Sequence, residues 1–146
     1  MVSNVMLVFL SFFASVGFGI LFRIRGRDLI WAGIAGMLTR IVLLILLAFL
    51  SNRLLYMTIA ASFAGLYGEF LATVRKEPST YFIYPAIVTL IPGDLFCYTM
   101  IGLFFGRTDM LIQNGVQCLL ALAGLSVGFV LSSTAAHYIR CQKKRL

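Results

Sequence analysis

The sequence predicts an all-α integral membrane protein, a bundle of about five transmembrane helices. Of its 146 residues, 61% are hydrophobic and only 12% are charged, whereas soluble domains are roughly half apolar and a quarter charged. About 20 helical residues cross a hydrocarbon core of about 30 Å, so the chain has room for five crossings and no soluble domain. We therefore expect residues 1–146 to form a single transmembrane domain.

Five apolar stretches follow one another along the chain, separated by short polar breaks. The stretches cover residues 2–22, 29–50, 54–74, 79–105 and 111–138, and residues 139–146 form a basic tail. The first stretch has no basic residue ahead of it and is too long for the apolar region of a secretory signal. We expect it to be a permanent anchor.

The basic residues alternate between the two sides of the predicted membrane. One side holds two of them, Arg53 and Arg107. The other side holds nine: Arg23, Arg25, Arg27, Arg75, Lys76, Arg140, Lys143, Lys144 and Arg145. Because cytoplasmic loops carry the excess of Lys and Arg, this pattern predicts an external N-terminus and a cytoplasmic C-terminus. The net charge of +7 is therefore interpreted as a topology signal, and no nucleic-acid partner is expected.

Small residues recur every four positions in two of the stretches. In the third stretch they are Ala60, Ala64 and Gly68, and in the fifth they are Gly124, Gly128, Ser132 and Ala136. Such stripes let transmembrane helices approach closely. Helix packing is the favoured interpretation, and the lining of a permeation path is the alternative. Five helices cannot divide into two inverted halves, so any such symmetry needs a second chain.

The fourth stretch contains the residues expected to break a helix. Proline removes a backbone donor and clashes with the preceding turn, so we expect the helix to break at Pro92-Gly93, with Pro85 as a further helix-breaking residue. Carbonyl groups freed at that depth are tolerated where they are buried in protein or line a wet cavity, and transporters use such breaks to bind substrates and ions. A packed kink without a ligand is the alternative.

Three charged residues fall inside apolar stretches: Arg40, Glu69 and Asp94. Ionised groups at that depth normally face the bundle interior, find a partner or change protonation. Arg40 is a candidate anchor for a substrate carboxylate, while Asp94 or Glu69 is a candidate for holding a substrate ammonium or the coupling proton. The alternatives are a structural ion pair and, for Glu69, a side chain that reaches the interface. Tyr98 and Thr99, which follow the break, are weaker candidates.

Two common enzymatic motifs are missing from the sequence. It contains no HExxH and no phosphate-binding loop. The three cysteines Cys97, Cys118 and Cys141 are far apart and are expected to be free thiols. We therefore expect no catalytic residues, no metal and no cofactor, and we predict that the chain moves a solute.

The run around the break resembles the small membrane subunit of the threonine/serine exporter family. The matching positions are Leu90-Ile91-Pro92-Gly93 and Tyr98-Thr99-Met100, preceded by Ala60-Ala61-Ser62, Glu69, Arg75-Lys76 and Pro78. The likeness spans residues 15 to 138. Two positions depart from the family pattern, because Thr89 stands where a proline is common and Asp94 where small or apolar residues are commoner.

This resemblance implies a five-helix subunit that works with a larger partner subunit in the bacterial inner membrane. The implied activity is export of small amino acids such as threonine and serine, driven by an ion gradient. A homo-oligomer is a further option for the assembly. Two other functions stay open: export of small organic acids of the dicarboxylate type, which Arg40 suits, and a non-transporting membrane module, for which the packing stripes suffice.

Overall fold

The computed structural model describes residues 4–24 and 26–143, of which 140–143 by their backbone alone, and these ranges contain six helices and no strand. The helices are α1 (Asn4–Leu21), α2 (Arg27–Phe49), α3 (Arg53–Arg75), α4 (Thr80–Val88), α5 (Gly93–Phe104) and α6 (Thr108–Lys143). Four of them are long and apolar enough to cross a membrane, and α4 with α5 gives a fifth span that is bent by 52°. The predicted all-α membrane bundle with a broken fourth helix is confirmed.

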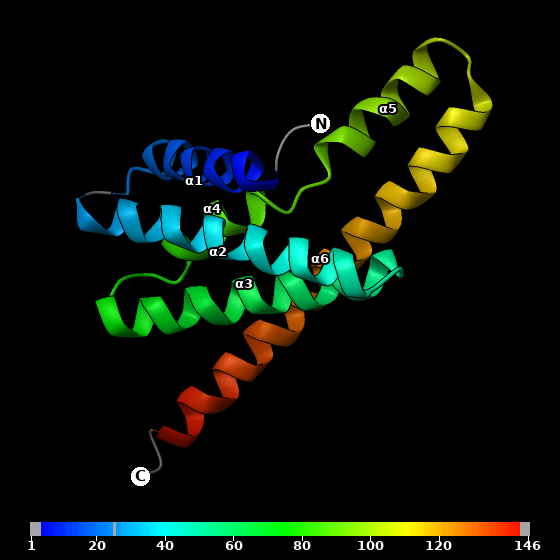
Figure 1. Ribbon diagram of the computed structural model, residues 1–146. Coiled ribbons are helices and arrows are strands. Elements are labelled where there is room, and N and C mark those ends of the chain that lie inside the picture. Colours follow the sequence, from blue (N-terminus) through cyan, green and yellow to red (C-terminus); the bar gives the residue numbers. More distant parts are fainter. Residues whose placement is uncertain (1–3, 25, 144–146) are drawn as a thin grey trace.

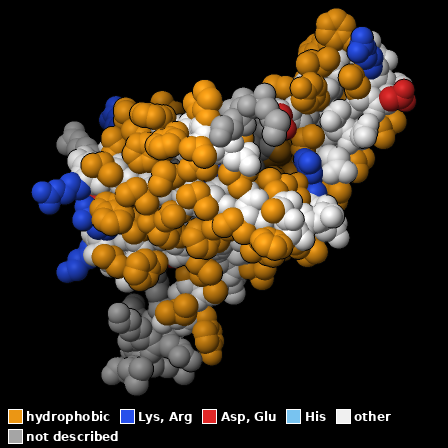
Figure 2. Space-filling model, viewed as in Figure 1, with side chains coloured by type: hydrophobic (Ala, Val, Ile, Leu, Met, Phe, Trp, Pro, Cys, Tyr) orange, Lys and Arg blue, Asp and Glu red, His pale blue; other side chains and the backbone are white. Residues whose placement is uncertain are grey.

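Basic side chains gather at one end of the bundle, which we call the basic end (Figure 2). Its described members are Arg23, Arg27, Arg75 and Lys76. Arg25, Lys144 and Arg145, which also enter the charge argument, lie outside the described residues, as do the side chains of Arg140 and Lys143. The visible faces between this end and the opposite one are covered by hydrophobic side chains (Figure 2), the surface expected of a chain whose solvent is lipid.

The helices at the basic end stop at residues with left-handed backbone. Arg23 (φ 58°) and Gly26 (φ 63°) turn the chain from α1 into α2, and Lys76 (φ 57°) ends α3. The amides of Lys76 and Glu77 both bond to the Ala72 carbonyl, which satisfies one of the acceptors that a helix C-terminus leaves open.

Helices α1 to α4 form the packed part of the molecule. In Figure 1, α1, α2 and α3 run side by side, and α4 packs against all three of them. Small residues fill the contacts between them, among them Ala35 on α2, Ala60 and Ala64 on α3, and Ala86 on α4, all with no exposed surface. Without a hydrophobic force between helices in lipid, close van der Waals packing through small side chains has to hold them together.

Helix α6 crosses α3 on the outside of this group (Figure 1). A Cβ on Gly124 would lie 2.8 Å from the Leu54 carbonyl oxygen, and one on Gly128 would collide with Thr58 and Ala61. Ser62 donates a hydrogen bond of 3.2 Å to the Gly128 carbonyl. The stripe on α6 therefore lies against α3, but it meets Met57, Ala61 and Gly65 rather than the stripe Ala60, Ala64 and Gly68. Gly68 instead faces Ile83 of α4.

The break between α4 and α5 occupies residues 89–92. The amide of Leu90 bonds to the Ile87 carbonyl and that of Gly93 to the Ile91 carbonyl, each at 2.8 Å, so the helical pattern is lost there. Pro85, by contrast, does not break the helix, because α4 continues past it to Val88. The hydroxyl of Ser15 on α1 donates a hydrogen bond of 2.7 Å to the Pro85 carbonyl, which is one of the acceptors left open at the C-terminus of α4.

Helix α5 and the first half of α6 form an arm that leaves the rest of the bundle (Figure 1). Among the described residues, α5 packs against α6 and against none of α1 to α4. Helix α6 has 36 residues, and at 1.5 Å per residue it is about 54 Å long. This is longer than the hydrocarbon core of about 30 Å, and because α6 crosses α3 obliquely its first half runs away from α1 to α3 (Figure 1).

Candidate substrate-binding cavity

A cavity of about 440 Å³ lies where the break faces the ends of α1, α2 and α3 that are farthest from the basic end. Its lining comprises Leu7, Arg40, Leu43, Leu47, Arg53, Tyr56, Met57, Leu90, Ile91, Pro92 and Asp94. The volume falls within the roughly 300–1,000 Å³ of small-molecule sites. We call this end of the bundle the cavity end. Leu47, Ile91 and Asp94 are exposed, so the cavity is open to its surroundings.

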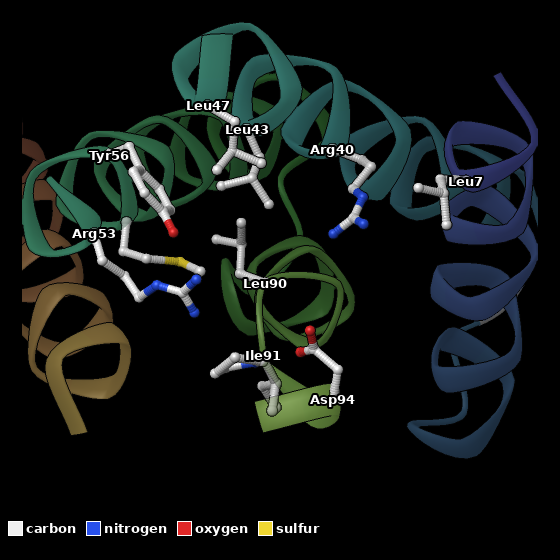
Figure 3. A pocket seen from close by; sticks show the side chains of 11 residues that line it. Leu7, Arg40, Leu43, Leu47, Arg53, Tyr56, Leu90, Ile91 and Asp94 are labelled. Carbon is white, nitrogen blue, oxygen red and sulfur yellow. The ribbon is translucent and has the colours of Figure 1, made fainter. Parts of the chain in front are cut away.

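Arg40 reaches the cavity from α2, one helical turn beyond Gly36 (Figure 3). Its Nε atom is buried and has no hydrogen-bond partner within the described part of the chain. A buried donor without an acceptor is costly, and more so when it carries charge. Arg40 is thus a half-buried side chain whose Nε donor has unused hydrogen-bonding capacity, and a guanidinium group can receive a carboxylate in a fork geometry.

Asp94 lines the same cavity from the first turn of α5. A carboxylate at that position is favoured by the dipole of α5, whose N-terminus is created by the break itself. The close-up shows the Asp94 carboxyl and the Arg40 guanidinium turned toward one space (Figure 3). Within residues 4–24 and 26–143 no ion pair joins the two, so both remain available to a ligand.

Arg53 and Tyr56 line the cavity as well, although the sequence did not suggest them as site residues. Arg53 is the first residue of α3, whereas the sequence pattern predicts only that it lies in a polar connection between two spans. The sequence does contain a signal that could have identified Arg53. Only a short turn separates α2 from α3, so Arg53 lies beside the second half of α2. The cavity therefore contains two guanidinium groups and one carboxylate.

The backbone carbonyls of the break are partly occupied by side chains. Besides the bond from Ser15 to the Pro85 carbonyl, the Thr89 hydroxyl donates one of 2.7 Å to the Ala86 carbonyl. The sequence suggested that such carbonyls would line the site. In the structure, the cavity receives its charge from three side chains, those of Arg40, Arg53 and Asp94.

Three of the predicted candidates lie elsewhere. Glu69 is 16 residues further along α3 than Arg53, or about 24 Å along the helix axis, and is near the basic end. Tyr98 and Thr99 are on α5 in the arm and do not line the cavity. Thr99 bonds to the Leu95 carbonyl of its own helix at 2.7 Å and faces Gly115 of α6. Of the three charged candidates, the structure brings together Arg40 and Asp94.

Comparison with known proteins gives one result for this chain. A family model described as Threonine/Serine exporter, ThrE, matches residues 7–135. No curated protein and no solved structure matches. The matched range contains the whole cavity lining, from Leu7 to Asp94.

Proposed function

The chain belongs to the threonine/serine exporter family, and from this premise we propose that it is one membrane subunit of a secondary transporter that exports small amino acids such as threonine and serine. The observation that carries the proposal is the pairing of Arg40 and Asp94 in one cavity. An amino acid carries one carboxylate and one ammonium group. The Arg40 guanidinium would hold the carboxylate and the Asp94 carboxylate the ammonium, so each charge of the amino acid would find a partner of opposite charge.

We infer that this subunit works with a larger membrane subunit of the same family, with a second copy of the chain as the alternative. Two features support this. Helix α5 packs only against α6 within the described residues, so the arm has a long apolar flank without a protein neighbour. An odd number of spans also cannot supply two inverted halves, which many secondary transporters use for alternating access.

The orientation that fits the charge pattern has the basic end in the cytoplasm of a bacterium and the cavity end outside its inner membrane. In this orientation the cavity is the site from which an exported amino acid would leave. Coupling to an ion gradient would supply the energy. Asp94 is our candidate for the proton-carrying group, because it is the carboxylate in the cavity.

Export of small dicarboxylates is a second candidate, and Arg53 favours it. With Arg40 it gives the cavity two guanidinium groups, which suits a ligand with two carboxylates. The two functions differ in what they require of Asp94. An ammonium group needs its negative charge, whereas a dicarboxylate is repelled by it, so Asp94→Asn would impair amino-acid export and spare or improve dicarboxylate export.

The experiment is efflux of labelled threonine from preloaded cells that express this chain with its partner subunit. We expect Arg40→Gln and Asp94→Asn to reduce efflux, each by about tenfold or more, because a hydrogen bond to a charged group contributes about 1.5–3 kcal/mol. Arg107→Gln and Asp109→Asn are matched controls, since Arg107 lies just before α6, Asp109 lies in its first turn, and both are exposed. Efflux that is unchanged by the cavity variants, or reduced equally by the controls, would refute the proposal.

A further inference from the structure

The two ends of the bundle differ in how tightly they are closed. At the cavity end, α1, α2, α3 and the break surround an open space. At the basic end, a second cluster of buried residues joins the same elements: Ile24, Ala32, Leu71, Ala72 and Phe82. Phe82 of α4, a member of this cluster, has no exposed surface. This cluster, which we call the plug, packs the ends of α2, α3 and α4 together at the basic end.

An ion pair closes the same end at the surface. Arg75 Nε donates to Asp28 Oδ1 at 2.7 Å, with side chains that are 31% and 20% exposed. Asp28 lies in the first turn of α2, and Arg75 is the last residue of α3. The pair therefore ties the ends of two cavity-lining helices together directly beside Leu71 and Ala72.

Helix α4 connects the plug to the cavity. Phe82 in its first turn belongs to the plug, and Leu90, which follows its last turn, is a wall of the cavity. The two residues are eight positions apart, or about 12 Å along a helix. Residues 89–92 separate α4 from α5, so α4 can tilt without moving the arm. A tilt of α4 about its middle would move Phe82 and Leu90 in opposite directions, so that withdrawing Phe82 from the plug would carry Leu90 into the cavity.

We propose that the Asp28–Arg75 pair and the plug form a gate, which is closed here while the cavity is open at the opposite end. The structure then represents one of the two states of an alternating-access cycle. In the other state the ion pair is broken, the plug is opened by α4 and the cavity is closed at its present mouth. The inference rests on the proposed function only in taking the cavity as the transport site.

The gate can be tested with two cysteine reporters that need no substrate. The native Cys97, Cys118 and Cys141 are first replaced by Ala or Ser. Leu71→Cys then reports on the plug, and Leu47→Cys reports on the cavity mouth. In sealed membrane vesicles of either orientation, the rate of alkylation by a membrane-impermeant maleimide is measured for each reporter.

We expect Asp28→Asn and Arg75→Gln to raise the labelling rate at position 71 and to lower it at position 47. Loss of a partly exposed ion pair shifts a two-state equilibrium by roughly two- to fivefold, and the rates should change by that factor. The exchanged pair Asp28→Arg with Arg75→Asp should return both rates toward those of the parent. Glu77→Gln, which removes an exposed carboxylate from the same end, is the matched control and should change neither rate.

Two results would overturn the gate. Rates that stay unchanged at both positions mean that the pair does not hold the closed state. A rise at position 71 without a fall at position 47, or a rise at both, means that the substitutions only loosen the bundle. Because labelling requires no amino acid, failure of threonine export and failure of the gate are distinguished.

Discussion

The packed group α1 to α4 and the arm formed by α5 and the first half of α6 are made of similarly apolar sequence, yet they differ in packing. In the packed group the contact positions are small: Ala32, Ala35 and Ala60 have no more than trace exposure. In the arm, large side chains such as Phe96 and Phe104 are exposed, the latter at 82%. In a bilayer, small residues at the right spacing determine which helices associate, and hydrophobicity does not.

The largest effect is expected where a glycine on α6 meets α3. A Cβ at position 128 would collide with the Thr58 carbonyl and lie 2.7 Å from the Ala61 Cβ, so Gly128→Ala has to push two helices apart. Overpacking of this kind typically costs about 1–3 kcal/mol. We expect a clear drop in the thermal unfolding midpoint of the detergent-solubilised protein.

Gly115→Ala on the same helix is the matched comparison in the arm. Its Cβ would lie 3.5 Å from the Thr99 side chain, an ordinary contact. We expect stability equal to or slightly above that of the parent, because alanine favours a helix by about 1 kcal/mol over glycine. Equal losses for Gly115→Ala and Gly128→Ala would break the distinction between arm and bundle.

A smaller effect is expected for Ser15→Ala within the packed group. Its hydroxyl donates to the Pro85 carbonyl at 2.7 Å in a site with no solvent exposure. A typical intramolecular hydrogen bond contributes about 0.5–1.5 kcal/mol to stability, less than the overpacking at position 128 costs. Ser11→Ala on the same helix removes only a bond to its own helix, to the Leu7 carbonyl, and should change the unfolding midpoint little. Similar midpoints for the two variants would show that Ser15 does not support α4.

The smallest effect on the chain alone is expected for Phe104→Ala at the end of α5. This side chain is almost fully exposed in the structure, so its truncation should change the stability of the isolated subunit by less than about 0.5 kcal/mol. If the arm is where a second subunit packs, the same substitution should reduce co-purification of that subunit. A large loss of stability in the isolated chain would instead show that the arm folds back onto the bundle.

Much of the fold could be predicted from the sequence, because hydropathy and helix-breaking residues act locally. The apolar runs and Pro92-Gly93 were sufficient to predict an all-α membrane bundle with a broken fourth helix. Pro85 shows the limit of such reasoning. A proline deprives only the carbonyl four residues earlier of its donor, so near the start of a helix it removes few bonds, and α4 begins only five residues before Pro85.

The candidate site was harder to predict, since it depends on which helices meet. Arg40 and Asp94 stood out because charges are rare at membrane depth, and both line the cavity. Arg53 was missed because a basic residue between two apolar runs has an obvious topological interpretation. Tyr98 and Thr99 follow the break in sequence, but a bend of 52° carries them into the arm. The direction of that bend is a tertiary property that local sequence does not contain.

In the mechanism we propose, the cavity with Arg40 and Asp94 binds the transported amino acid. The most direct measurement is the shift in thermal unfolding midpoint that threonine causes, in the protein purified with any partner that efflux requires. A ligand that binds only the folded state raises the midpoint. We predict a rise for the parent and for Arg107→Gln and none for Arg40→Gln. A rise that persists in Arg40→Gln, or no rise in the parent, would contradict the account.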